Sequence, residues 1–413
     1  MSSLKAFNRI QQLPYLILVL LSLFPVLNIK ALSILSLIFF VSSVFFNLKK
    51  IKLNWNHIGY KPLLVNTLFY LILAISIIYS PLKSQGFDLL IRQIGLLLLP
   101  VILIYAIKIP GELIKIMSTI FILSNVLVFV YFCIKLNLFQ DFISQPSEFF
   151  NTPYFLEITN SDYKDWHPTY IAINNLLASV FLLDYIFKPK PIKLKVLAAF
   201  LIGVFLVFAL ILNSRIIFFL TLVIIPFFIF FKIKSIKYKA ITILSVLIIA
   251  VSLYSVSSSN KLGRIFEYPA QYYISNFNAK TLLGVRYQVQ ECSLELVKRK
   301  PILGYGVGYE KKLLTDYCFE VKNFQNKYLK SYTSHNVYLS IMFSAGVLAL
   351  IAFLVMLFNN LVLGIKKRDL LHVSILVIFI IAFLTENYLI RLNGILLFAF
   401  LNSYFYQKNY INN

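Results

Sequence analysis

The chain has 413 residues, of which 60% are hydrophobic and 13% charged, and its mean hydropathy is +0.81. A composition this apolar excludes a soluble globular protein, because apolar stretches long enough to cross a bilayer recur from end to end. The formal net charge of +23 is divided among short clusters between those stretches. Such clusters are typical of topology signals and require no nucleic-acid partner. We therefore expect a single integral membrane domain over residues 1–413.

The hydropathy pattern predicts an all-α polytopic protein with about twelve transmembrane spans. We expect them at 13–29, 31–48, 62–80, 87–106, 111–133, 168–187, 194–212, 213–231, 239–257, 335–363, 370–389 and 393–407. The first apolar run follows Lys5 and Arg9 without a small-residue cleavage site, so we interpret it as an uncleaved span.

The distribution of Lys and Arg predicts the orientation of these spans. With the N-terminus in the cytoplasm, the inner segments hold 20 Lys and Arg residues and the short outer segments hold 6. Because cytoplasmic loops are enriched in these residues, both termini are expected to be cytoplasmic. Residues 135–167 then form a smaller outer loop and residues 258–334 a large one.

The large outer loop contains an amphipathic pattern followed by a glycine-rich turn. Apolar residues repeat at helical spacing over Val285–Lys300, with charged residues on the other side. Pro301 ends this predicted helix, and Gly304, Gly306 and Gly308 permit tight backbone turns after it. The segment then leads to a hydrophobic span, so we expect the functional groups of this region at the outer membrane face.

His335 and Asn336 stand at the start of that span, behind Ser334, which we predict to be the N-cap of the helix. A neutral imidazole near pH 7 can remove a proton from a hydroxyl group, so His335 is the candidate general base. A lone histidine at a helix start is also a common interfacial residue. His167, before Pro168 at the start of another span, has the same two interpretations.

Arginine is the side chain best suited to bind phosphate at this face. Arg215 opens the eighth predicted span within an apolar stretch, and Arg286 belongs to the amphipathic helix. A guanidinium stays charged and offers a fork of donors that matches phosphate oxygens. The alternatives are a snorkelling interfacial residue for Arg215 and a solvated helix face for Arg286.

Several functional signatures are absent from the sequence. There is no phosphate-binding loop of the ATPase type, no cluster with metal-ligand spacing and no dinucleotide-binding setting around the glycines. We therefore expect no metal and no cofactor. The chain has three cysteines, and two of them, Cys292 and Cys318, share the large outer loop. The sequence leaves open whether these two form a disulfide or stay free thiols.

Taken together, these motifs resemble the O-antigen ligase/polymerase family. The likeness rests on Arg286, on Pro301–Gly308 (PILGYGVG), on Ser334–Leu339 (SHNVYL) entering a span with Gly346, and on the Ser-Arg pair at Arg215. Residues 167–170 (HPTY) and the C-terminal region from 386 to 403 also agree, so the likeness covers about 167–403. One departure is that a Trp is expected a few residues after Arg286, whereas Tyr287 is the only aromatic residue nearby.

The resemblance implies a glycosyltransferase that uses a lipid-linked donor and requires neither metal nor nucleotide. It would move a glycan from undecaprenyl diphosphate to a lipid A-core sugar at the outer face of the bacterial inner membrane. His335, Arg215 and Arg286 are then the expected catalytic residues. The expected substrate-binding residues are Arg215, Arg286, Asn336, Arg264 and His167. A polymerase that extends carrier-linked glycan is the alternative within the family, and a transporter of lipid-linked glycan is the alternative from another class.

Overall fold

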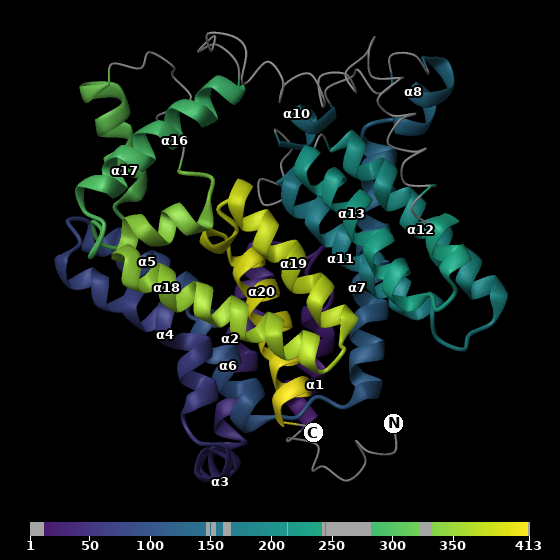
Figure 1. Ribbon diagram of the computed structural model, residues 1–413, viewed down its shortest axis with the longest axis horizontal. Coiled ribbons are helices and arrows are strands. Elements are labelled where there is room, and N and C mark those ends of the chain that lie inside the picture. Colours follow the sequence, from purple (N-terminus) through teal and green to yellow (C-terminus); the bar gives the residue numbers. More distant parts are fainter. Residues whose placement is uncertain are drawn as a thin grey trace. The chain divides into compact units, whose positions relative to one another are not determined.

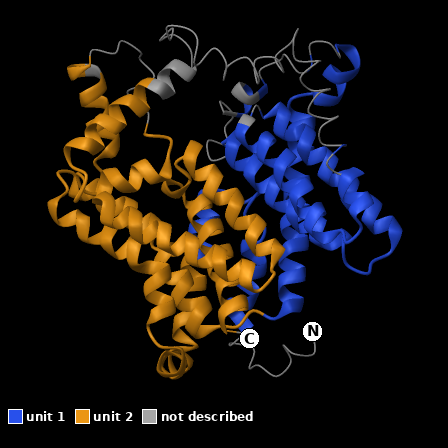
Figure 2. Cartoon of the chain, in the orientation of Figure 1, with its two compact units in different colours: residues 1–36, 110–275 blue, residues 37–109, 276–413 orange. Residues whose placement is uncertain are grey.

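The computed structural model describes residues 12–145, 149, 154–159, 167–212, 214–241, 244, 282–322 and 333–411. Every regular element within these ranges is helical, and no strand occurs among them (Figure 1). The expected all-α fold is therefore confirmed for the described residues. The chain divides into two compact units, residues 1–36 with 110–275 and residues 37–109 with 276–413 (Figure 2). The expected single integral membrane domain over residues 1–413 stays a prediction.

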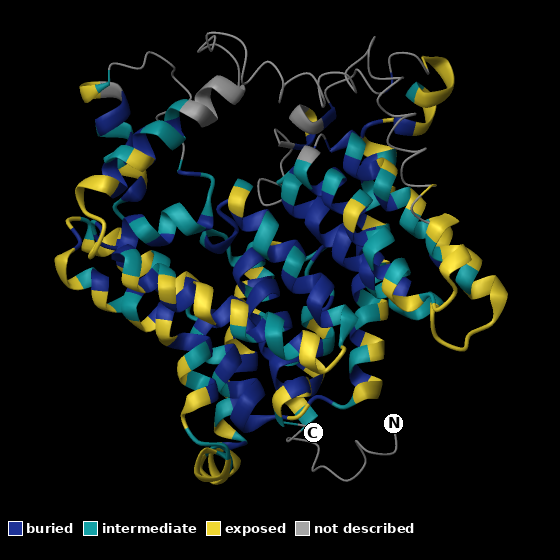
Figure 3. Ribbon diagram, viewed as in Figure 1, coloured by how far each residue is buried: buried dark blue, intermediate teal, exposed yellow. Residues whose placement is uncertain are grey.

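Unit 1 is built around one central helix. It contains α1 (Leu13–Leu21), α7 (Gly111–Lys135), α8 (Leu138–Ser144), α10 (Tyr154–Thr159), α11 (Pro168–Ile186), α12 (Ile192–Ile211) and α13 (Arg215–Lys232). Helix α11 packs against α7, α12 and α13, and most of its residues are buried (Figure 3). Its first turn begins at Pro168, whose fixed φ suits the start of a helix.

Unit 2 contains the remaining helices, and α2 (Ile29–Phe45) crosses the boundary between the units. They are α3 (Leu48–Ile58), α4 (Lys61–Ile75), η3 (Ser76–Tyr79), α5 (Lys83–Gln93), α6 (Gly95–Val101), η4 (Ile102–Ala106), α16 (Leu282–Arg299), α17 (Glu310–Asp316), η5 (Tyr317–Val321), α18 (Val337–Lys366), α19 (Leu370–Thr385), η7 (Tyr388–Ile390), α20 (Leu392–Tyr406) and η8 (Gln407–Ile411).

Helix α18 organises unit 2, because it packs along both α4 and α19. Three buried asparagines join it to its neighbours. Asn360 Nδ2 donates to Asn66 Oδ1 at 3.0 Å and to Asn402 Oδ1 at 2.8 Å, and Asn402 Nδ2 donates to Asn66 Oδ1 at 3.2 Å. Hydrogen bonds between buried amides hold apolar helices together in a membrane. Lipid tails are as apolar as the helix side chains, so hydrophobic contact by itself does not favour the pairing of helices there.

Six helices in the described residues are long and apolar enough to cross a membrane, and a seventh is counted if α2 and α3 form one span bent by 72°. The long helices correspond to the expected spans at 62–80, 87–106, 111–133, 168–187, 194–212 and 335–363. Helices α13, α19 and α20 occupy three further expected positions but are shorter. The expected span at 239–257 lies almost entirely outside the described residues. A multi-pass membrane protein is thus supported, and the number twelve stays a prediction.

Candidate functional site

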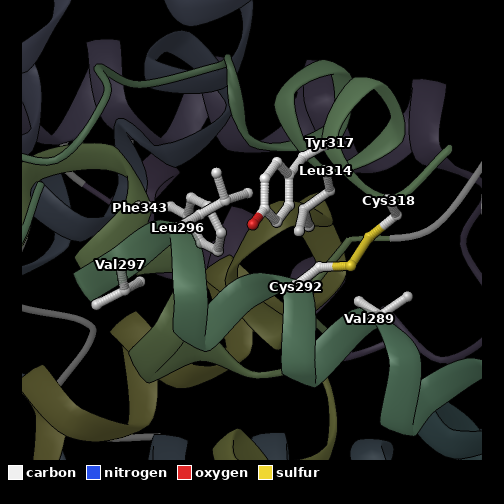
Figure 4. Packing of buried hydrophobic residues seen from close by; sticks show 8 residues of the cluster. All are labelled: Val289, Cys292, Leu296, Val297, Leu314, Tyr317, Cys318 and Phe343. Carbon is white, nitrogen blue, oxygen red and sulfur yellow. A yellow bond between two sulfur atoms is a disulfide. The ribbon is translucent and has the colours of Figure 1, made fainter. Parts of the chain in front are cut away.

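The amphipathic helix predicted over Val285–Lys300 is present as α16, and Pro301 follows its end as expected. Its apolar face packs against α17, η5 and the start of α18 in a cluster that includes Leu296, Leu314 and Phe343 (Figure 4). A disulfide joins Cys292 to Cys318 within this cluster. The pairing that the sequence left open therefore joins two cysteines 26 positions apart, and α16 is covalently fixed to η5.

An ionic network lines the outside of the same cluster. Glu295 accepts hydrogen bonds from Lys322 Nζ and from the Tyr317 hydroxyl, both at 2.5 Å. The Tyr317 hydroxyl also accepts from Arg299 at 2.9 Å, and the guanidinium lies over its ring. The bond from Lys322, and next the one from Tyr317, lower the pKa of Glu295 below its usual value. These contacts strengthen the attachment of α16 to η5.

The glycine-rich segment after Pro301 crosses α18 at a break in that helix. Gly346 has a φ of 71°, which interrupts the helical conformation inside α18. The freed carbonyls of Phe343 and Ser344 accept from the backbone nitrogens of Tyr305 (2.6 Å) and Gly306 (3.0 Å). A side chain at Gly346 would meet the backbone of Ile302, so only glycine permits this crossing.

The other side of the glycine segment docks on η3 and α5. Ser80 Oγ donates to the Val307 carbonyl at 2.8 Å, and the Val307 nitrogen donates to Ser76 Oγ at 3.1 Å. Gly306 and Gly308 have positive φ values and lie too close to this neighbouring backbone for a Cβ. The segment is thus a structural clamp, and its N–H groups at 305–307 are used within the protein.

His335 faces a carboxylate that sequence reasoning did not assign to it. Its Nδ1 lies 3.4 Å from Oε2 of Glu386, which follows the last residue of α19. The Glu386 side chain is 7% exposed and that of His335 is 24% exposed. The pair therefore combines a buried acid with an imidazole that solvent or a substrate can reach.

Asn336, rather than Ser334, is the N-cap of α18, which corrects the sequence prediction. Its Oδ1 accepts from the Leu339 nitrogen at 3.0 Å, and its Nδ2 donates to the Leu384 carbonyl at 3.1 Å. Both ends of the amide thus fasten α18 to the end of α19. The role of Asn336 in binding substrate stays a prediction.

Ser334 is instead bound by Glu310, a residue that the sequence analysis did not single out. The Glu310 carboxylate accepts from the backbone nitrogen and hydroxyl of Ser334 at 2.8 and 2.7 Å and from Ser340 Oγ at 2.5 Å. An acidic residue in the first turn of a helix is ordinarily explained by the helix dipole. The place of Glu310 in the sequence therefore gives no sign of its hydrogen bonds to Ser334 and Ser340, which lie 24 and 30 positions away.

For two of the predicted arginines the structure describes only the position of the backbone. Arg215 is the first residue of α13 and Arg286 lies in the first half of α16, with side chains outside the described set. Arg264 lies wholly outside the described residues. His167 is the N-cap of α11, and its ring contacts that of Tyr170 at 5.9 Å. Because Arg215 and His167 belong to unit 1, their convergence with His335 stays a prediction.

No group of three or more His, Cys, Asp or Glu residues suited to holding a metal ion occurs in the described part of the chain. The features at hand are helices long and apolar enough to span a membrane, a hairpin formed by α16, α17 and η5 (residues 282–321) and closed by a disulfide, and a histidine–carboxylate pair where α18 and α19 meet. They are typical of a multi-pass helical membrane protein with a histidine–carboxylate pair at a helix end.

Residues 198–354 match the family model described as O-Antigen ligase. The resemblance to this family that the sequence showed is thereby confirmed over these residues. The family consists of glycosyltransferase-like membrane enzymes, ligases and polymerases. The matched stretch contains Arg215, Arg264, Arg286 and His335, whereas His167 and Glu386 lie beyond its ends. No curated protein gives a significant match to the chain.

Proposed function

We propose that this protein is an O-antigen ligase-like glycosyltransferase. It moves a glycan from undecaprenyl diphosphate to a sugar of the lipid A core, at the outer face of the bacterial inner membrane. The observation that carries the proposal is the family match over residues 198–354, which contains His335 and the three predicted arginines. The contact between His335 and Glu386 supplies a chemical role for the histidine.

In this reaction His335 acts as the general base. Glu386 accepts a hydrogen bond from the Nδ1–H group. This bond fixes the tautomer in which Nε2 carries no proton and can receive one. The hydroxyl oxygen of the acceptor sugar attacks the anomeric carbon of the donor while its proton moves to Nε2. The bond between the anomeric carbon and the diphosphate oxygen breaks, and the electron pair leaves with undecaprenyl diphosphate.

The leaving diphosphate gains negative charge as that bond breaks, so fixed cations near it lower the barrier. Arg215 and Arg286 are the proposed cations, with Arg264 and His167 as further contacts to the substrates. The apolar spans provide a lateral surface for the polyprenyl chain. No step in this scheme needs a metal or a nucleotide.

The disulfide supports the proposed location of the large loop. Disulfides persist in oxidising compartments such as the bacterial periplasm and are rare in the cytosol. Cys292 and Cys318 lie in the loop that the Lys and Arg pattern assigns to the outer side. We therefore infer a multi-pass inner-membrane protein with both termini in the cytoplasm.

Mass analysis of lipopolysaccharide from a deletion strain tests the proposal. We expect lipid A core without polymer, together with accumulated carrier-linked polymer, and restoration by the wild-type chain. Lipid A core capped by single repeats would instead identify a polymerase. Repeat units trapped on the inner leaflet would identify a transporter and contradict a transferase.

A further inference from the structure

The turn that carries His335 is held in an uncommon backbone conformation. His335 has a φ of 48°, in the left-handed region that residues with a Cβ seldom adopt. A histidine keeps this conformation only where the surrounding contacts outweigh its cost. The contacts on both sides of His335 explain how the turn is kept.

Glu310 supplies the contacts that enclose this turn. One carboxylate oxygen accepts from the backbone nitrogen and hydroxyl of Ser334, directly before the histidine. The other accepts from Ser340 Oγ, in the first turn of α18 beyond it. Glu310 is 8% exposed, so water competes little for its oxygens. A single buried side chain thus fastens both flanks of the His335 turn to α17.

The position of Glu310 is itself tightly fixed. It begins α17, which follows the glycine clamp and precedes η5 with its disulfide to α16. Because the clamp holds the chain up to Gly308 and the disulfide holds it from Cys318, the Glu310 backbone has little freedom to move. The carboxylate therefore forms a rigid support for the turn.

We propose that Glu310 is a positioning residue for His335. Its three hydrogen bonds hold the 334–340 turn so that the imidazole meets Glu386 and keeps Nε2 turned to the acceptor hydroxyl. This role rests on the proposed function of His335 as the general base. Glu310 itself touches no substrate and acts through the histidine.

Glycan transfer by the purified full-length protein in lipid nanodiscs measures this role. The substrates are a polyprenyl-diphosphate-linked oligosaccharide and a lipid A-core acceptor. For Glu310→Ala we expect kcat to fall about 10-fold to 100-fold, since a misplaced catalytic group loses rate to this extent, with the donor KM unchanged. Glu320→Ala, which removes an exposed carboxylate from η5, is the matched control and should transfer at the wild-type rate.

A double substitution separates positioning from general stability. If Glu310 acts through the histidine, the variant that combines His335→Ala with Glu310→Ala should be no slower than His335→Ala alone. Wild-type kcat in Glu310→Ala would overturn the proposal. So would a double variant slowed by the full product of the two single effects. If Glu310→Ala does not accumulate, Ser340→Ala removes one of the three bonds, and kcat should fall about threefold to tenfold with the same non-additivity.

Chemical modification distinguishes a failure of this proposal from a failure of the proposed function. The rate at which diethyl pyrocarbonate modifies His335, followed by peptide mass spectrometry, should rise in Glu310→Ala while that of His57 stays constant. If wild type transfers no glycan but this rate rises, the proposed function is wrong, and only the structural support of the His335 turn by Glu310 holds. If wild type is active and the rate is unchanged, the positioning role is wrong.

Discussion

At the scale of single residues, the central feature is a histidine whose partner is 51 positions away in the chain. His335 and Glu386 meet because α18 begins where α19 ends, and Asn336 and Tyr338 fasten these two ends together through the carbonyls of Leu384 and Ile380. The imidazole thus lies against a buried acid that is distant from it in the sequence.

Glu386→Ala should lower the kcat of glycan transfer about 10-fold to 100-fold, because losing the carboxylate that orients a functional histidine typically costs this much. Glu386→Gln keeps an acceptor for the Nδ1 proton but loses the charge, so its kcat should lie between those of Glu386→Ala and wild type. Steady-state assays with donor and acceptor varied separately measure the effect. Equal rates in wild type and Glu386→Ala would show that the pair has no catalytic role.

Arg215→Ala and Arg286→Ala should each abolish detectable transfer while the protein still inserts in the membrane. Removing one preorganised partner of a developing charge costs roughly 2–4 kcal/mol of transition-state stabilisation. Lysine at either position keeps the charge but loses the planar fork, so a partial rate is expected. Lys298→Ala, an exposed cation on the same helix as Arg286, is the control. Full activity of both alanine variants would refute their role.

At the scale of elements, the glycine clamp (residues 301–308) can cross α18 only because glycine stands at a few positions of close backbone contact. Gly346→Ala should destabilise unit 2 by roughly 2–4 kcal/mol, since it adds a strained φ and a clash with the Ile302 backbone. Gly203→Ala in α12 is the matched control, because no atom lies within 4 Å of its added Cβ. Thermal unfolding in detergent measures both. A transition of Gly346→Ala at the wild-type temperature would contradict the clamp.

The α16–η5 hairpin should respond to pH through Glu295 and Lys322. The lowered pKa of Glu295 means that its contribution exists above the ordinary glutamate pKa and is lost as the pH falls through the lowered value. The raised pKa of Lys322, caused first by its bond to Glu295, means that its contribution exists below the ordinary lysine pKa and is lost at higher pH.

Proteolysis of the hairpin in the full-length protein should therefore be slowest between these limits and should accelerate toward strongly acidic pH. Glu295→Gln removes the titrating group and should flatten the acidic limb. Cleavage rates across pH with an acid-tolerant protease measure this, with a peptide substrate correcting for the protease itself. An acidic limb that persists in Glu295→Gln would show that other groups control the hairpin.

At the scale of the whole molecule, the orientation of the loops decides whether the proposed chemistry is possible. Cys292 and Cys318 should react with a membrane-impermeant maleimide added outside spheroplasts, and only after reduction of their disulfide. Cys133 within α7 is the third cysteine, so Cys133→Ser serves as the background for the measurement. Labelling that requires permeabilised membranes would place the loop in the cytoplasm and exclude the proposed reaction.

The sequence predicted much of the fold because its signals are local. Hydropathy predicted helices near α4, α7, α11 and α12, and periodicity with Pro301 predicted α16 to within a few residues. The candidate site was predicted less completely. His335 stood out by its type and place, whereas its partner Glu386 and its support Glu310 did not. The Ser334 cap was wrong because the buried carboxylate of Glu310 engages that hydroxyl.

Composition, apolar length and motif order can be read without knowing any distance, so they were enough to predict a helical membrane protein and its resemblance to the O-antigen ligase family, which the family model matches over residues 198–354. Only the tertiary structure decided which polar groups meet: Cys292 with Cys318, His335 with Glu386, and Glu310 with the turn before α18. The physical reason is that these partners are brought together by helix packing. Each contact depends on where whole helices begin, break and end relative to one another, and no local pattern encodes that.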